Sequence, residues 1–274
     1  MLRARVTTSF FLVAFFLVAL IFAPSWLWSL ICLAATLIGV WEWCNLINLN
    51  KIQMRWTVAS ASIIGLLLIF ITDTQFAHLH DSLILGILSA AAIFWVFVAP
   101  LWLITRIKIN RSFIMTILGL VLLLSLWIGL IGLQQISPWL LLSILATVWI
   151  ADIAAYFSGK RFGKHKLAIE ISPGKTWEGV AGALVAVTFY GLLLCHFKHY
   201  QLWVIIGLWA IVVLSIIGDL FESLLKRQAG IKDSSQLLPG HGGVLDRIDG
   251  LIPSLPLVLF FIYLPLFSNI QLHV

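Results

Sequence analysis

Long apolar runs separated by short polar segments dominate the hydrophobic pattern of this chain. A helix needs about 20 apolar residues to cross a bilayer, and nine runs approach or reach that length. The third run is short and the ninth contains Pro253 and Pro256, so either helix could be tilted or broken. The pattern predicts an all-α, polytopic membrane protein with about nine transmembrane helices. The predicted spans are 6–23, 25–46, 56–71, 83–105, 112–133, 138–157, 177–197, 202–225 and 251–267.

The basic residues predict how these helices are oriented. With the N-terminus placed in the cytoplasm, every one of the 17 Lys and Arg residues except Lys198 lies on the cytoplasmic side. Cytoplasmic segments of membrane proteins carry an excess of Lys and Arg, and an incorrect count of spans would disrupt the alternation. We therefore expect a multi-pass protein of the cytoplasmic (inner) membrane, with its N-terminus in the cytoplasm and its C-terminus outside.

Composition excludes a soluble protein, because 62% of the residues are hydrophobic and 10% are charged, against about 45–50% and about 25% in soluble domains. The net charge of +6 does not indicate a nucleic-acid partner, since the basic residues follow the topology. Residues 1–137 form an N-terminal transmembrane region with short loops. Residues 138–274 form a C-terminal transmembrane region with two long cytoplasmic loops, 158–176 and 222–250, where chemistry is expected. We expect the two regions to form one integrated membrane domain.

Two carboxylates, Asp152 and Asp219, lie inside apolar runs. A charge there costs a few kcal/mol unless it is paired, metal-bound or in a wet cavity. Both are functional candidates, with a structural ion pair between spans as the alternative. The polar residues that begin with Asp219 share one helical face, which must look into a polar cavity. Its acidic end could bind a metal and its basic end an anion, or the basic residues could only anchor the topology. They are Asp219, Glu222, Ser223, Lys226 and Arg227.

The segment 238–250 contains a proline and several glycines, which favour a tight turn whose backbone can approach a ligand closely. Asp246 and Asp249 are three residues apart and would share a face of a helix. Paired carboxylates next to phosphates suit Mg²⁺, which takes one or two carboxylates and completes its shell with water and substrate oxygens. His241 has no Cys or second His nearby, so it does not indicate a zinc site.

The segment 172–179 has the sequence Ser-Pro-Gly-Lys-Thr-Trp-Glu-Gly. It is not a P-loop, because Ile169 stands where the first glycine is required and no βαβ pattern surrounds it. We expect a turn that leads into a helix. Backbone N–H groups at a helix start, together with Lys175, would bind phosphate. The alternative is an ordinary helix cap with an interfacial lysine.

Three blocks resemble the phosphatidate cytidylyltransferase (CDP-diacylglycerol synthase) family. The signature block starts as Ser-Leu-Leu-Lys-Arg-x4-Lys-Asp at position 223 and ends as His-Gly-Gly-Val-Leu-Asp-Arg-Ile-Asp at position 249. Asp-Ile-Ala-Ala-Tyr-Phe from position 152 and the block 172–179 precede it in the expected order. The resemblance is strong over 152–250, whereas the first half matches only as a polytopic apolar region. It implies an Mg²⁺-dependent reaction of CTP with phosphatidic acid, giving CDP-diacylglycerol and pyrophosphate, in an all-helical fold with its site at the cytoplasmic membrane surface.

With this resemblance, each candidate residue is assigned a role. The metal, one or two Mg²⁺ ions, is assigned to Asp219, Asp246 and Asp249. The CTP phosphates are assigned to Lys175 with Ser172 and Thr176, and a lipid or CTP phosphate to Lys226 and Arg227. Substrate contacts are also expected from Ser223, His241 and Asp152, the last either near the metal or at the cytidine. The partners are CTP and phosphatidic acid in the bilayer, with a homodimer left open.

Three other functions compete with this hypothesis. A CTP-dependent polyprenol or lipid kinase would transfer the γ-phosphate to an alcohol. A cytidylyltransferase for another lipid would share most of the site. A transporter would also bury acids in its spans, but transporters usually show internal repeats and midplane sites, whereas here no repeat is evident and nine of the 11 carboxylates gather on the cytoplasmic side.

Overall fold

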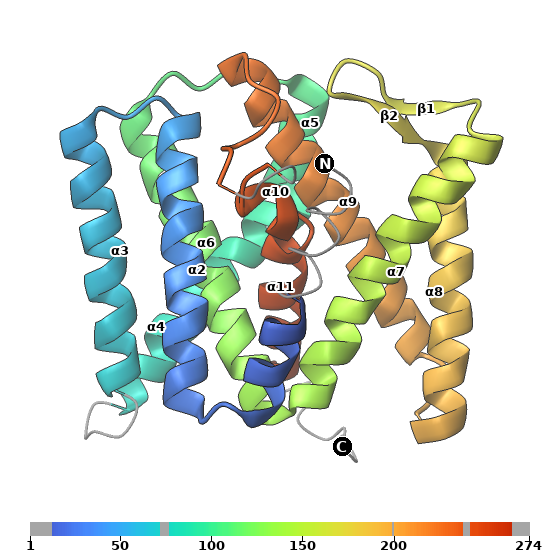
Figure 1. Cartoon of the computed structure of the whole chain (residues 1–274), viewed down its shortest axis with the longest axis horizontal. Helices are drawn as coiled ribbons and strands as arrows, with labels where there is room; N and C mark the ends of the chain where they lie inside the picture. Colours follow the sequence, from blue (N-terminus) through green and yellow to red (C-terminus); the bar gives the residue numbers. More distant parts are fainter. Residues whose placement is uncertain (1–12, 72–76, 199, 238–241, 265–274) are drawn as a thin grey trace.

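A computed structural model describes residues 13–71, 77–198, 200–237 and 242–264 as a bundle of helices with one small hairpin (Figure 1). The all-α class is confirmed. The elements are a short helix Val13–Phe22, α2 (Ser25–Leu46), α3 (Lys51–Ile71), α4 (Ala77–Ile93), the π-helix η1 (Phe94–Val98), α5 (Ala99–Thr105), α6 (Ser112–Ile136), α7 (Pro138–Phe162), β1 (Lys166–Ala168), β2 (Ser172–Thr176), α8 (Trp177–Lys198), α9 (Val204–Ala229), α10 (Leu245–Ile248) and α11 (Leu251–Tyr263).

Seven of the predicted spans correspond to stretches of the described chain that are long and apolar enough to cross a membrane. They are α2, α3, the continuous α4–η1–α5, α6, α7, α8 and α9. The predicted first and ninth spans correspond to the shorter apolar helices Val13–Phe22 and α11. Both adjoin parts of the chain outside the described residues, so the polytopic class is confirmed, but the count of about nine is not.

Figure 1 shows that the connections α2–α3, α5–α6, α7–α8 and α9–α11 all lie at the same end of the bundle. The connections α6–α7 and α8–α9 lie at the opposite end. The first group holds the basic clusters that set the predicted orientation, whereas Lys198 ends α8 at the other side. The alternation that the sequence predicts is therefore present in the fold. Which end faces the cytoplasm stays a prediction from the positive-inside rule.

The segment 172–176 differs from its prediction. It is not a turn: Ser172–Thr176 forms β2, which pairs antiparallel with β1 and runs directly into α8. The turn lies earlier, where the backbone N–H of Ile171 donates to the carbonyl of Ala168 at 3.2 Å. Pro and Gly in the segment suggested a turn, but pairing with β1 satisfies the backbone in an extended form. The hairpin projects from the bundle at the end that carries the basic clusters (Figure 1).

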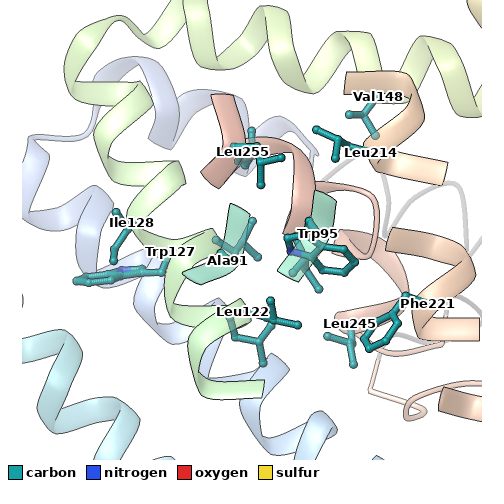
Figure 2. Close-up of a cluster of buried hydrophobic side chains, with 14 of the residues drawn as sticks. Ala91, Trp95, Leu122, Trp127, Ile128, Val148, Leu214, Phe221, Leu245 and Leu255 are labelled. Atoms are coloured by element: carbon teal, nitrogen blue, oxygen red, sulfur yellow. The ribbon is translucent and has the colours of Figure 1, made fainter. Parts of the chain in front are cut away.

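An aromatic cluster packs against the side of α9 opposite its polar residues. Phe94, Trp95 and Trp102 each meet Phe221 edge-on, with ring centroids 5.2–5.6 Å apart. Figure 2 shows Trp95, Phe221 and Leu245 in this part of the core. The rings of Phe94 and Trp95 come from the wide turn η1. Pro100 at the start of α5 lacks the N–H that a regular helix would use there, which accounts for the local irregularity. The cluster fixes the rotation of α9, so its polar face points toward α10 and the hairpin.

The short helix α11 lies at the centre of the bundle, where it packs on α4, α6 and α9. Ile252, Leu255, Leu257 and Leu259 are buried. Despite two prolines the helix is continuous over Leu251–Tyr263, with Pro256 inside it. Because α11 belongs to the C-terminal region whereas α4 and α6 belong to the N-terminal one, helices of both regions share one core. The boundary near residue 137 stays a prediction.

Candidate active site

The polar face of α9 is formed by two side-chain pairs, each separated by one helical turn. Ser223 Oγ donates to Asp219 Oδ1 at 3.3 Å, and Lys226 Nζ lies 3.3 Å from Glu222 Oε2. This is the geometry that i and i+4 positions dictate in a helix. The Glu222 side chain is 4% exposed and the Asp219 side chain 38%. The face is therefore divided into a buried pair and a more accessible pair.

The accessible pair is completed by residues from two other elements. Lys175 Nζ on β2 lies 2.6 Å from Asp219 Oδ2. Asp152 on α7 is close enough to both groups for their charges to act on it. The sequence placed these three residues in different segments without a contact between them. The hairpin and the packing of α7, α8 and α9 bring them together.

The buried pair is completed by Asp246 of α10. Its Oδ1 lies 2.6 Å from Lys226 Nζ, and its carboxylate accepts the backbone N–H groups of Gly243 at 2.8 Å and Ser234 at 3.0 Å. Burial would raise the pKa of Asp246, but the hydrogen bonds from Lys226 and from these N–H groups outweigh it, so the pKa lies below its usual value. Asp246 is an ionised carboxylate that organises the loop around it.

Asp249 follows α10 and lies half-buried beside α9. Burial and the negative charge of Asp219 raise the pKa of Asp249, and both Asp246 and Asp249 act electrostatically on Glu222. This close approach depends on Gly218, because a Cβ there would collide with the backbone carbonyl of Asp249 and with Pro253. A small residue next to Asp219 thus allows the α10–α11 connection to lie against α9.

The remaining predicted substrate residues have mixed positions. Ser172 begins β2. Thr176 is buried and accepts the N–H of Gly179 at 3.1 Å in the first turn of α8, and Arg227 Nε donates to the carbonyl of Ile171 at 3.5 Å. His241 lies outside the described residues. Thr176 and Arg227 therefore support the hairpin in this structure, and the substrate roles of all four stay predictions.

Sequence reasoning gave no role to Glu42, which the structure places in the site. Its carboxylate on α2 is fully buried and accepts hydrogen bonds from Ser235 Oγ and from the N–H of Leu245, both at 2.6 Å. Glu42 is an isolated acid at the end of an apolar run, which was the available signal. Its partners Ser235 and Leu245 lie 193 and 203 positions away, so no local pattern could identify the contact.

The donor chemistry of the site suits a divalent cation, although its present arrangement is not a ready-made ligand set. No group of three or more His, Cys, Asp or Glu side chains in the described part of the chain is arranged to hold a metal. Two expected ligands are paired with lysines, Asp219 with Lys175 and Asp246 with Lys226. The carboxylates nevertheless outnumber these lysines. The buried oxygens of Glu222 accept no hydrogen bond from the described residues, and Oε2 forms an ion pair with Lys226 at 3.3 Å. An excess of carboxylates over lysines of this kind fits Mg²⁺.

The fold and the site together define an integral membrane protein with an acidic, lysine-bearing site at one end of a polytopic helical bundle. A family model described as the cytidylyltransferase family matches residues 3–265, and the chain belongs to this family.

Curated relatives agree with this assignment along most of the chain. A Pseudomonas aeruginosa protein named phosphatidate cytidylyltransferase is 37% identical over 93% of this chain and 95% of its own length. A Haemophilus influenzae protein of the same name is 33% identical over 96% of this chain and 99% of its own length. One from Staphylococcus saprophyticus is 32% identical over 78% of this chain and 82% of its own length. The resemblance found in the three sequence blocks is confirmed.

Proposed function

We propose that this protein is a phosphatidate cytidylyltransferase, which converts CTP and phosphatidic acid into CDP-diacylglycerol and pyrophosphate. The proposal is carried by one observation: two lysine–carboxylate pairs lie at the same end of the bundle. Lys175 pairs with Asp219, with Asp152 nearby, and Lys226 pairs with Asp246. At this end a water-soluble nucleotide and a lipid head group can meet. The names of the curated relatives support the same substrates.

In the proposed reaction an oxygen of the phosphatidate phosphate forms a bond to the α-phosphorus of CTP. The bond between that phosphorus and the bridging oxygen of the β-phosphate breaks, and pyrophosphate leaves with the electron pair. A phosphate oxyanion is already a nucleophile, so the protein mainly has to orient the two substrates and neutralise their charge. No strong general base is required.

The two lysines are suited to this task. Lys175 lies on the projecting hairpin with its side chain 23% exposed, so it can turn from Asp219 to a phosphate of CTP. Lys226 is more buried, at 13%, and is held between Glu222 and Asp246. We assign Lys175 to the nucleotide and Lys226 to the phosphate near the transfer point. Each would stabilise negative charge through a charge-assisted hydrogen bond.

Mg²⁺ is part of the proposal, with Asp219, Asp246 and Asp249 as the residues that would hold it. When bound, it supplies positive charge to the phosphate oxygens on which negative charge builds up during transfer. The proximity of Asp219 to Asp249 favours these two as direct ligands. Asp246 already accepts hydrogen bonds from three N–H groups. We therefore expect it to be a weaker ligand than Asp219 and Asp249.

The decisive experiment uses purified protein in lipid vesicles that contain phosphatidic acid, with Mg²⁺ and CTP labelled at the α-phosphorus. Label should enter a lipid, with one pyrophosphate released per lipid formed. Entry of label only from γ-labelled CTP would instead identify a lipid kinase. Transfer to a polyprenyl phosphate but not to phosphatidic acid would identify a cytidylyltransferase for another lipid. No transfer of α-label to any lipid would overturn the proposal.

The proposed location is the inner membrane, with the N-terminus and the active site on the cytoplasmic side. The one-sided basic clusters support this orientation. So does the need for CTP, which is a cytoplasmic solute, to reach Lys175.

A further inference from the structure

Glu42 connects the first half of the chain to the proposed active site. It lies near the end of α2, is 0% exposed, and receives four hydrogen bonds from the loop between α9 and α11. Leu245 N donates to its Oε2 at 2.6 Å and Val244 N to its Oε1 at 3.0 Å. Ser235 Oγ donates at 2.6 Å and Ser234 Oγ lies at 3.2 Å. One carboxylate therefore holds both sides of this loop.

The energetics of burial make this contact a strong constraint. A carboxylate removed from water costs several kcal/mol unless hydrogen bonds replace its hydration. Here backbone N–H groups and serine hydroxyls replace it. Removing the carboxylate would leave the buried N–H of Leu245 without an acceptor, at about 1–3 kcal/mol, and the part-buried N–H of Val244 at a smaller cost. The hydrogen bonds of the loop are thus satisfied in one position against α2, and any other position loses them at a cost in free energy.

Ser234 extends the constraint from Glu42 to the active site. Its hydroxyl lies 3.0 Å from Asp246 Oδ2 and 3.2 Å from Glu42 Oε2, so it stands between the two carboxylates. Packing is tight here, because a Cβ on Gly243 would collide with Ser234 Oγ and with the carboxylate of Glu42. A shift of Glu42 would therefore move α10 and its Asp246.

We propose that Glu42 is a positioning residue for the transfer reaction. Its carboxylate holds α10 in register with α9, so that Asp246 reaches Lys226 and Asp249 lies beside Asp219. This inference rests on the proposed function. It gives the first half of the chain a role in the chemistry, in addition to its role as membrane scaffold.

Glu42→Gln is the most informative change, because it preserves size but places an NH₂ group against one of the two backbone N–H donors. We expect kcat to fall on the order of 100-fold, since a shift of about 1 Å at a reacting centre has that effect. The Mg²⁺ concentration for half-maximal activity should rise, and amide hydrogen exchange in peptides covering 242–250 should become faster. Glu42→Asp, which keeps the charge, should give intermediate values.

Thr36→Val is the matched control, because Thr36 is also buried on α2 and precedes Glu42 by about 9 Å along the helix axis. It should leave kcat, the Mg²⁺ response and exchange over 242–250 near the wild-type values. A purely structural Glu42 would lower thermal stability without changing the Mg²⁺ response. Active wild-type protein combined with unchanged kcat, Mg²⁺ response and exchange in Glu42→Gln would overturn the inference. Wild-type protein without any transfer to lipid would instead overturn the proposed function.

Should Glu42→Gln fail to insert, Ser234→Ala and Ser235→Ala provide the same test with the carboxylate retained. Ser234→Ala removes the hydroxyl between Glu42 and Asp246. It should lower kcat and raise the Mg²⁺ concentration for half-maximal activity more than Ser235→Ala does. Wild-type values in both variants would overturn the inference.

Discussion

Replacement of Asp219 by asparagine separates the chemistry of the site from its stability. The change keeps the size of the side chain and removes its charge. Asp219 pairs with Lys175 at 2.6 Å, but its side chain is 38% exposed, so water screens the pair. Accessible ion pairs of this kind contribute about 0–1 kcal/mol to folding. The amide oxygen of the new asparagine could still accept the hydrogen bond from Ser223, so Asp219→Asn should cost at most about 1 kcal/mol of stability.

The effect on turnover should be much larger. Removing one group that stabilises charge in a transition state typically costs 10²–10³ in kcat, about 2.7–4 kcal/mol. Loss of a metal ligand adds to this cost. We therefore expect Asp219→Asn to reduce kcat by roughly 1,000-fold or more. A defect of this size cannot follow from a stability loss of about 1 kcal/mol in a protein that is still folded at the assay temperature.

The assay measures the initial rate of label transfer from α-labelled CTP to phosphatidic acid over a range of Mg²⁺ concentrations. The thermal midpoint of the detergent-solubilised protein is measured on the same samples. Asp233→Asn is the control, because Asp233 lies in the loop between α9 and α10 and is exposed. This variant should be close to wild type in both turnover and thermal midpoint. Near-normal turnover of Asp219→Asn with an unchanged Mg²⁺ response would refute the metal assignment and move the metal site elsewhere.

Three further predictions test neighbouring parts of the site and the topology. Lys175→Ala should raise KM for CTP, lower kcat, or both, and so reduce kcat/KM by tenfold or more, because a hydrogen bond to a charged group is worth about 1.5–3 kcal/mol. Unchanged CTP kinetics would leave the hairpin with a structural role only. Asp246→Asn should abolish turnover and, unlike Asp219→Asn, should also lower the thermal midpoint, because breaking a buried pair costs about 3–5 kcal/mol; a midpoint equal to that of wild type would contradict the pairing with Lys226. A reporter fused after Val274 should be active only outside the cytoplasm, and cytoplasmic activity alone would refute the nine-span topology.

Features set by local periodicity were predictable from the sequence. Apolar runs identified α2 and α6 through α9. A segment in lipid must satisfy its backbone hydrogen bonds internally, so a long apolar run is expected to be a helix. The pairs Asp219–Ser223 and Glu222–Lys226 follow from the 3.6-residue period alone. The distribution of basic residues predicted which connections lie at the same end of the bundle, because Lys and Arg in short loops set the orientation of a membrane protein.

Features set by partners distant in sequence were not predictable. The strand Ser172–Thr176 depends on β1, and a short strand without a visible partner resembles a turn when it contains Pro and Gly. Periodicity also could not show that α11, with its two prolines, is the centre of the bundle, because hydropathy does not distinguish lipid from protein as the apolar environment.

The site itself divides along the same line. The charged residues themselves could be picked out from the sequence. Asp219 stood out because a charge inside an apolar run is costly, Lys226 because it shares a helical face with Asp219, and Asp246 because it is spaced three residues from Asp249. Their pairing, Lys175 with Asp219 and Lys226 with Asp246, depends on how the helices and the hairpin pack. The tertiary structure also introduced Glu42, whose hydrogen bond to Ser234 spans 192 positions. Helical spacing fixes neighbours within one turn, whereas contacts between helices depend on how the whole bundle packs.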